Sequence, residues 1–371
     1  MADVFNGIWG QPKVRNYLRC ASSRGALSHA YLLCGPAGSG KVSAAYALAA
    51  SRLCKKGGCG SCEICKRVLR RRHPDVRYYE PEGAAAYLVG QVREIMSDVV
   101  LAPIQADAKV YIINRADLLN AASANAFLKT LEEPPAGVML ILLARTVDAV
   151  LPTIVSRCQV IPFRTVPEEE AIGLVSQNAG VPEERARMAL AACDGSAERA
   201  VDFARSNKCM AHMRDVFEMM GTLRQCDDWD IITMSRKLVT FAEAPLDDVR
   251  REQEEYLEAN ADFLSRAAVK QIRERDERAT KSATRQAQVT EMSLLKSWLR
   301  DVMVLCIGAE DLVVNTEARS ALEDAASHTT EAAVASAIRA VDTAIETLSY
   351  NVSPQTCMDT LLFDIREALY D

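Results

Sequence analysis

The chain has 371 residues and a formal net charge of −6. This length is sufficient for two or three domains with their own cores, and the acidic balance excludes a nucleic-acid-binding surface spread over the whole protein. Apolar runs fall short of the roughly 18 residues that a membrane-spanning helix needs, and the N-terminal residues lack the charged-then-apolar pattern of a targeting signal. We expect a cytoplasmic protein without a membrane-bound segment.

The N-terminal part is predicted to run through a helix into a strand, a glycine-rich turn and a second helix. Residues 4–29 carry apolar side chains at helical spacing, residues 30–33 form an apolar run, and residues 43–49 are rich in alanine. A strand, a glycine-rich turn and a helix in this order are the context of a phosphate-binding P-loop.

The turn itself contains the residue types that bind phosphate. Gly35, Gly38 and Gly40 allow the backbone to curve around a phosphate with its N–H groups pointing inward, and the start of the helix adds partial positive charge. Lys41 can reach the outer phosphates of a nucleotide. We interpret these four residues as a nucleotide-binding loop, which is a separate claim from an active ATPase.

The residue after the lysine does not suit magnesium. A P-loop NTPase has a serine or threonine at this position, and its hydroxyl binds Mg²⁺. This chain has Val42, which offers no oxygen. Ser43 lies one residue further on, rotated by about 100° around the helix axis, so it is a poor substitute.

Four closely spaced cysteines follow the predicted helix. Their C-x4-C-x2-C-x2-C spacing, with glycines between, lets four sulfurs converge on one ion, which predicts a structural zinc site at Cys54, Cys59, Cys62 and Cys65. Two disulfides and an iron–sulfur cluster are the alternatives. Four thiolate ligands leave no position for water, so such a zinc ion would not be catalytic. The other eight of the twelve cysteines are scattered, as in a reduced cytosolic protein.

The middle of the first half alternates between predicted strands and helices. Strands are predicted over residues 76–79, 109–113 and 138–143, and helices over residues 89–99 and 120–133. Repeated strand-then-helix segments indicate a doubly wound parallel sheet that extends to about residue 165.

The strand over residues 109–113 ends without the expected acidic residues. A P-loop NTPase has one carboxylate there that holds Mg²⁺ and a second that positions water. This chain has Asn114 and Arg115, and the arginine would repel the metal. Asp117 lies beyond the strand end, where we do not expect it to reach the site. Together with Val42, this predicts that ATP hydrolysis has been lost.

Several motifs resemble the gamma/tau/delta-prime branch of the AAA+ ATPases, whose members are clamp-loader subunits of bacterial DNA polymerase III. The motifs are residues 28–33 before the P-loop, the cysteine cluster after it, residues 125–135 (NAFLKTLEEPP) and Ser156-Arg157-Cys158. They occur in the family's order and span roughly residues 5–165. The chain resembles the branch member with degraded nucleotide chemistry more closely than the ATP-hydrolysing gamma/tau subunit.

The resemblance implies a role for the Ser-Arg-Cys motif. In this family its arginine projects into the ATP site of the neighbouring subunit. Carried onto this chain, Arg157, which follows Ser156, would be this trans-acting arginine finger and would stabilise charge on a γ-phosphate. The chain's own P-loop would then be vestigial, without ATP as a working cofactor.

The resemblance also implies three domains. These are an α/β AAA+ P-loop domain over residues 1–166 with a zinc-binding insert at 54–65, a small helical lid over 167–208, and an all-α collar over 209–371 that holds subunits in a ring. Rare proline and glycine and repeated amphipathic stretches favour helices throughout the collar range.

Two charged features of these later domains bear on function. Glu198 occupies the position where active family members have a second phosphate-sensing arginine, and Arg199 is one residue away. Residues 270–285 are rich in lysine and arginine but also contain acids, which is more typical of a solvated helix face than of a DNA-binding patch.

We therefore predict a clamp-loader subunit that is not an ATPase as an isolated chain. The implied partners are the gamma/tau ATPase and delta subunits, with the sliding clamp and primer–template DNA reached through the complex. One alternative is an active gamma/tau-type ATPase, which Val42, Asn114 and Arg115 disfavour. The other is a zinc-dependent nucleic-acid-binding module on a relic P-loop fold, which the acidic charge disfavours.

Overall fold

The structure is a computed structural model that describes residues 3–82, 86–259, 266–350 and 352–370. The chain forms two compact units, one from the described residues of ranges 1–170 and 261–279, the other from those of 171–260 and 280–371. The predicted lid and collar ranges thus fall largely within one unit, and the first residues of a long helix join the N-terminal unit. The three-domain division stays a prediction.

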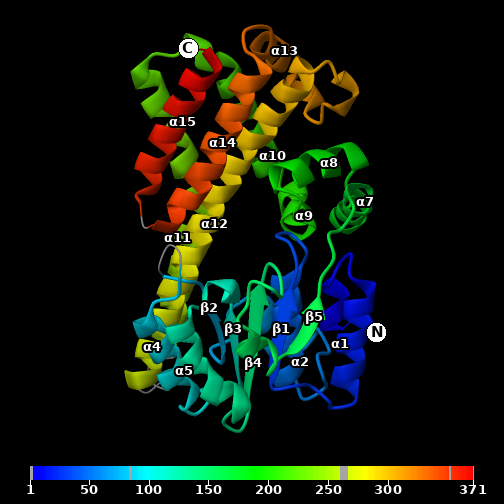
Figure 1. The fold of residues 1–371 in the computed structure, drawn as a ribbon, viewed down its shortest axis with the longest axis vertical. Helices are drawn as coiled ribbons and strands as arrows, with labels where there is room; N and C mark the ends of the chain where they lie inside the picture. The colour runs from blue at the N-terminus through cyan, green and yellow to red at the C-terminus, as the bar shows by residue number, and fades with distance from the viewer. Residues whose placement is uncertain (1–2, 83–85, 260–265, 351, 371) are drawn as a thin grey trace. The chain divides into compact units, whose positions relative to one another are not determined.

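The first unit contains a parallel sheet of five strands (Figure 1). The strands are β1 (Ala30–Cys34), β2 (Val76–Tyr79), β3 (Lys109–Ile113), β4 (Val138–Ala144) and β5 (Gln159–Pro162). Their order in the sheet is β2-β3-β4-β1-β5, and every pairing is parallel. The predicted doubly wound parallel sheet is confirmed, and the four predicted strands agree to within one residue at either end. The sequence analysis did not predict β5, because this short edge strand is largely exposed and partly polar.

Helices cover both faces of this sheet. The helices of the first unit are α1 (Pro12–Ser23), α2 (Lys41–Leu53), α3 (Glu63–Leu69), α4 (Val89–Val99), α5 (Ala121–Glu132) and α6 (Pro152–Val155), with short 3-10 turns η1 (Val4–Gly7) and η2 (Ala116–Leu118). Successive side chains of a strand point to opposite faces, so Leu33 joins the core with α1, α2 and α3, whereas Leu32 joins the core with α4, α5 and α6. Strands β1, β3 and β4 are buried throughout for this reason.

The second unit is helical, as predicted for the collar range. Its helices are α7 (Glu168–Ala179, whose first turn belongs to the first unit), α8 (Glu183–Ala192), α9 (Ala197–Arg205), α10 (Asn207–Thr222), α11 (Asp228–Ala259), α12 (Arg266–Cys306, whose start belongs to the first unit), α13 (Arg319–Ser327), α14 (Glu331–Thr347) and α15 (Pro354–Tyr370). Short 3-10 turns are η3 (Leu223–Gln225), η4 (Glu310–Leu312), η5 (Thr316–Ala318) and η6 (Leu348–Tyr350). None of the described helices is long and apolar enough to cross a membrane.

A buried carboxylate anchors the loop after α12. Asp301 is fully buried and accepts hydrogen bonds from the backbone N–H groups of Val314 and Asn315 and from the Asn315 amide. The indole of Trp298, one turn earlier on the same helix, is also fully buried. Such a paired carboxylate replaces the water that these N–H groups lose on burial, and it holds the loop against the helix.

The first residues of α12 pack within the N-terminal unit. The Arg278 guanidinium lies 5.0 Å from the centre of the Tyr79 ring and 3.3 Å from the Glu94 carboxylate. Lys270, further towards the helix start, is exposed and pairs with Glu274 at 3.8 Å. Two basic side chains of residues 270–285 therefore have acidic partners, and the solvated helix face stays a prediction.

Candidate functional site

The predicted P-loop lies between β1 and α2, where a nucleotide-binding loop is expected. The strand ends at Cys34 and the helix begins at Lys41, with Gly40 as its N-cap at a φ of +84°. Gly38 also has a left-handed backbone, at a φ of +71°. Side chains are strained in this region of φ, so the loop requires glycine at both positions.

Gly35 is required for a different reason, because its backbone passes close to the end of β5. A Cβ atom added to Gly35 would lie 2.6 Å from the Phe163 carbonyl oxygen and 2.8 Å from the Phe163 Cβ. The Gly35 N–H also donates to the Ala144 carbonyl at the end of β4, at 3.2 Å. The start of the loop is thereby held between two strands.

Replacing Gly35 with alanine is expected to destabilise the protein by about 1–3 kcal/mol, because the new methyl group meets backbone rather than a movable side chain. Urea unfolding measures this change. Gly90→Ala is the matched control, since Gly90 is exposed in the first turn of α4 with open space around it, and alanine should not destabilise the protein there. Equal effects of the two substitutions would contradict the close approach.

Lys41 folds back onto the loop that precedes it. Its ammonium group donates to the carbonyl oxygens of Gly35 and Pro36, both at 2.5 Å, and lies 3.3 Å from the Ser39 hydroxyl. Burial lowers the pKa of Lys41 to about 8. A lysine in this position occupies the space inside the loop and can turn outward only by giving up these carbonyl acceptors.

Gln11 ties the P-loop to the segment after β5, and sequence analysis missed it. Its amide donates to the Ser39 carbonyl at 3.2 Å and to the Arg164 carbonyl at 2.7 Å, and it accepts from the Arg164 N–H at 3.2 Å. Gln11 is 3% exposed, although it stands just before α1. A single glutamine before a helix carries no sequence signal for such a contact.

The end of β3 lacks carboxylates, as the sequence predicts, and its polar groups are already engaged. The Asn114 amide donates to the Glu80 carboxylate at 3.1 Å, and its own side-chain oxygen accepts from the Arg115 N–H at 3.0 Å. Arg115 has a left-handed backbone at a φ of +53° and pairs with Asp117 at 3.0 Å.

Asp117 lies closer to the P-loop than we expected. Its side chain is 8% exposed, and its charge partly offsets the lowering of the Lys41 pKa by burial. The reason is local: η2 folds back and packs against β4, which is the neighbour of β1 in the sheet. The carboxylate is nevertheless paired with Arg115, which competes with any bound cation.

Val42 supplies packing instead of a metal ligand. Its side chain is partly buried and packs against the core that lies between the sheet and α1, α2 and α3. The hydroxyl that a P-loop NTPase has at this position is therefore replaced by apolar contact.

Arg157 follows α6 at the surface of the first unit and is held by three neighbours. Its Nε donates to Glu132 Oε1 at 2.8 Å, and its Nη2 also bonds to that oxygen. Its Nη1 donates to the Thr153 carbonyl at 2.9 Å and to the Ser156 hydroxyl at 3.2 Å. These hydrogen bonds fix the orientation of the guanidinium, and one-third of the side chain is still accessible.

The four clustered cysteines come together as predicted. The sulfur atoms of Cys54, Cys59, Cys62 and Cys65 all lie within 4.8 Å of one another. Cys54 Sγ is 3.8 Å from Cys59 Sγ and 3.7 Å from Cys62 Sγ, and every cysteine of the described residues is a free thiol. A disulfide requires sulfurs at about 2.05 Å, so the arrangement does not fit the two-disulfide alternative.

The surroundings of this cluster favour thiolates at its outer edge. Backbone and hydroxyl donors of Ser61 lower the pKa of Cys59 to about 5, whereas burial raises the pKa of Cys65. The Cys62 sulfur caps the start of α3 by accepting from the Cys65 N–H. Four cysteine sulfurs this close together could coordinate one metal ion.

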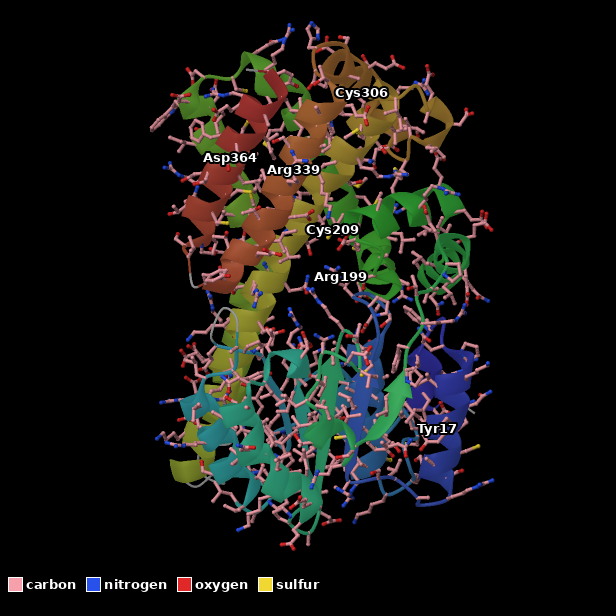
Figure 2. The ribbon with its side chains drawn as sticks, in the orientation of Figure 1. Tyr17, Arg199, Cys209, Cys306, Arg339 and Asp364 are labelled. Carbon is pink, nitrogen blue, oxygen red and sulfur yellow. The ribbon has the colours of Figure 1, made fainter. Side chains whose placement is uncertain are left out.

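Glu198 and Arg199, at the position of the family's second phosphate-sensing arginine, lie on α9 of the second unit. The Arg199 guanidinium, labelled in Figure 2, donates to the Cys193 carbonyl at the end of α8, at 2.6 Å. Glu198 is the neighbouring residue in the first turn of the same helix. Arg199 therefore has a structural contact within its own unit.

Comparisons with known proteins identify relatives of this chain. Residues 10–167 match the family model described as DNA polymerase III, delta subunit. The chain is 29% identical over 361 residues to DNA polymerase III subunit delta' of Bacillus subtilis, which covers 96% of both proteins. It is 37% identical over 166 residues to subunit delta' of Pseudomonas aeruginosa, which covers 43% of this chain and 48% of that protein. The chain is therefore similar to the clamp-loader subunits of DNA polymerase III.

Other clamp-loader relatives match mainly the first unit. The chain is 37% identical over 170 residues to subunit gamma of Buchnera aphidicola, and this match spans about half of each protein. Among solved structures, a gamma subunit-related protein of Thermotoga maritima has 16% identity and a TM-score of 0.41, with 94% of this chain and 98% of that one covered. A TM-score this low does not establish a shared fold, and we assign the fold from the strand order of the sheet.

The structure separates the candidate residues into three places. Lys41, Asn114 and Asp117 are found after the carboxyl ends of the central strands, whereas Arg157 follows α6. The four clustered cysteines lie between the end of α2 and the first turn of α3. Sequence reasoning missed Gln11 and Glu132. Glu132 had a signal, because it stands in the NAFLKTLEEPP motif, but only the fold brings it to Arg157.

Proposed function

We propose that this chain is a delta-prime-type subunit of the DNA polymerase III clamp loader. In this role it assembles with gamma/tau and delta subunits and acts, through the complex, on the sliding clamp and primer–template DNA during replication. The similarity to a delta' subunit along 96% of the chain supports this assignment. The free thiols of the described residues agree with a reducing, cytoplasmic compartment.

The loss of magnesium ligands is the observation that carries the second half of the proposal, an inability to hydrolyse ATP. Mg²⁺ is held by oxygen ligands in near-octahedral geometry. Val42 offers none, the Asn114 amide is bound to Glu80, and Arg115 adds a positive charge next to the site. Asp117, the carboxylate that does lie near, is paired with that arginine. Several changes therefore converge on the same chemistry.

Arg157, next to Ser156, would then act on a neighbour's nucleotide rather than on the chain's own. Its guanidinium is exposed, preorganised and outside the chain's own P-loop. A guanidinium offered in trans stabilises the charge that develops on the γ-phosphate during hydrolysis. The P-loop with Gly35, Gly38, Gly40 and Lys41 would be a vestige of this chain's own ATPase.

We propose a structural zinc ion at the cysteine cluster. Four sulfurs at about 2.3 Å from a tetrahedral zinc lie about 3.8 Å apart, and the sulfur distances of 3.7 and 3.8 Å fit this geometry. An iron–sulfur cluster would hold its thiolates further apart, because several irons lie between them. Cys54, Cys59, Cys62 and Cys65 would fill all four positions, so the ion would stabilise the loop and perform no catalysis.

The purified chain is expected to hydrolyse ATP no faster than its Lys41→Ala variant, with or without Mg²⁺, because magnesium has no ligand set. Steady-state phosphate release measures this. In a complex with gamma/tau and delta subunits, the same Lys41→Ala substitution should leave the ATPase rate unchanged. Mg²⁺-dependent hydrolysis by the single chain that Lys41→Ala abolishes would overturn the proposal in favour of an active ATPase.

A further inference from the structure

We propose that Glu132 is the positioning residue for Arg157. The carboxylate holds the Nε side of the guanidinium while the far end of the side chain contacts a neighbour's phosphate. This inference rests on the proposed function, since it assumes that Arg157 acts in trans. It adds a residue outside the Ser-Arg-Cys motif to the site.

The hydrogen bonds of Arg157 divide into two kinds. A guanidinium has five N–H groups, and four of them are engaged within this chain. Two point to one oxygen of the charged Glu132 carboxylate, and the two on Nη1 point to the neutral oxygens of Thr153 and Ser156. The fifth, on Nη2, has no acceptor among the described residues.

A phosphate oxygen would displace the neutral partners of Arg157 more easily than the charged Glu132 carboxylate. Charge-assisted hydrogen bonds are roughly twice as strong as neutral ones. An incoming γ-phosphate therefore replaces the Thr153 carbonyl and the Ser156 hydroxyl on Nη1, and it also takes the free N–H of Nη2. Glu132 keeps Nε and the inner N–H of Nη2. The outer end of the guanidinium becomes the fork that grips phosphate, with its plane already set.

The backbone on both sides of this pair is rigidly placed. Glu132 is the last residue of α5, and Arg157 follows α6, which packs directly against α5. Leu131 and Ile154, which neighbour the pair on each helix, are buried in the same core. Glu132 thus reaches Arg157 from a fixed position, although the two side chains lie at the surface.

Exposure limits the size of the effect. Half of the Glu132 side chain and one-third of the Arg157 side chain are accessible, and ion pairs of this kind contribute little in water. In the reconstituted complex, Glu132→Ala is expected to lower the kcat of the clamp-stimulated ATPase by about two- to five-fold, with KM for ATP unchanged. Glu132→Gln keeps the acceptor oxygen and should recover part of this loss.

A double-mutant cycle separates positioning from a general structural role. In the Arg157→Ala background, Glu132→Ala should have no further effect on the residual rate, because its partner is already gone. Glu133→Ala is the matched control, since Glu133 is the exposed neighbour, and it should leave kcat unchanged. Thermal unfolding and gel filtration of each variant show that the chain folds and assembles.

The outcomes distinguish this inference from the proposed function. If Arg157→Ala leaves the rate unchanged, the trans role itself is wrong. If Arg157→Ala is strongly impaired but Glu132→Ala is unchanged or faster, the trans role stands and the positioning role of Glu132 is wrong. An equal loss from Glu132→Ala in both backgrounds also contradicts positioning.

Discussion

Replacing Arg157 with alanine is expected to lower the clamp-stimulated ATPase rate of the reconstituted complex by roughly two or more orders of magnitude. In the proposed function, the substitution removes the guanidinium that would offer positive charge to a γ-phosphate bound by the neighbouring subunit. Among the described residues, the Arg157 guanidinium hydrogen-bonds to Glu132, Thr153 and Ser156 near the surface of the unit, so its loss should not disturb folding. Steady-state ATP hydrolysis and clamp loading by the complex measure the effect.

Two controls make this result specific. Arg24→Ala removes a different exposed arginine of the same unit, and it should leave the rate unchanged. Gel filtration should show that the Arg157→Ala complex still assembles, because the family resemblance implies that residues 209–371, and not Arg157, hold the subunits together. Normal ATPase activity of an assembled Arg157→Ala complex would remove the arginine finger from the proposed function.

Loss of the proposed zinc ion is expected to destabilise the first unit. The purified chain should contain about one zinc ion, and Cys54→Ser should release it, because each sulfur fills one of four ligand positions. The free energy of zinc binding contributes directly to folding. If about 3 kcal/mol of it is lost, Tm should fall by about 6–12 °C for a unit of this size. Metal analysis and thermal unfolding measure both changes.

The predicted destabilisation follows from what the cysteine loop holds. The Gly58 carbonyl accepts from the Val4 N–H at 3.0 Å, and the Gly57 carbonyl accepts from the Ser22 hydroxyl at 3.0 Å. The loop therefore joins the N-terminal turn η1 to helix α1. Opening of the loop should loosen both.

Cys20→Ser is the control for this second experiment, because Cys20 is exposed on α1 and outside the cluster. It should change neither zinc content nor Tm. Sensitivity to a reducing agent, together with insensitivity to a chelator, would show that the cysteines form disulfides and would contradict the zinc site. Iron in place of zinc in the metal analysis would also contradict the zinc site.

Sequence patterns were sufficient where one short stretch contains the whole signal. The P-loop is of this kind, because its glycines, its lysine and the flanking strand and helix are consecutive. The cysteine cluster is another, since its spacing alone lets four sulfurs meet. The buried strands β1, β3 and β4 were also predictable, because a strand covered on both faces is apolar at every position.

Other features depended on segments that are distant in sequence. Gln11 binds Ser39 and Arg164, and Glu132 binds Arg157. Strand β5 lies at the sheet edge, where partial exposure removes the apolar pattern that marks the other strands. In each case the residue types are ordinary, and the contact exists only because the chain folds two remote segments together.

The sequence by itself determined that this chain has a parallel α/β unit with a P-loop, a cysteine cage and no magnesium ligands at two expected positions. These properties could be predicted because each depends on the residue types within one short stretch. The absence of a hydroxyl or carboxylate at a motif position can be read directly from the sequence. The tertiary structure decided where the remaining charges lie. It placed Asp117 near Lys41, because parallel strands bring the loops after β1 and β3 to the same end of the sheet. It gave Arg157 the partner Glu132, because α5 and α6 pack against each other.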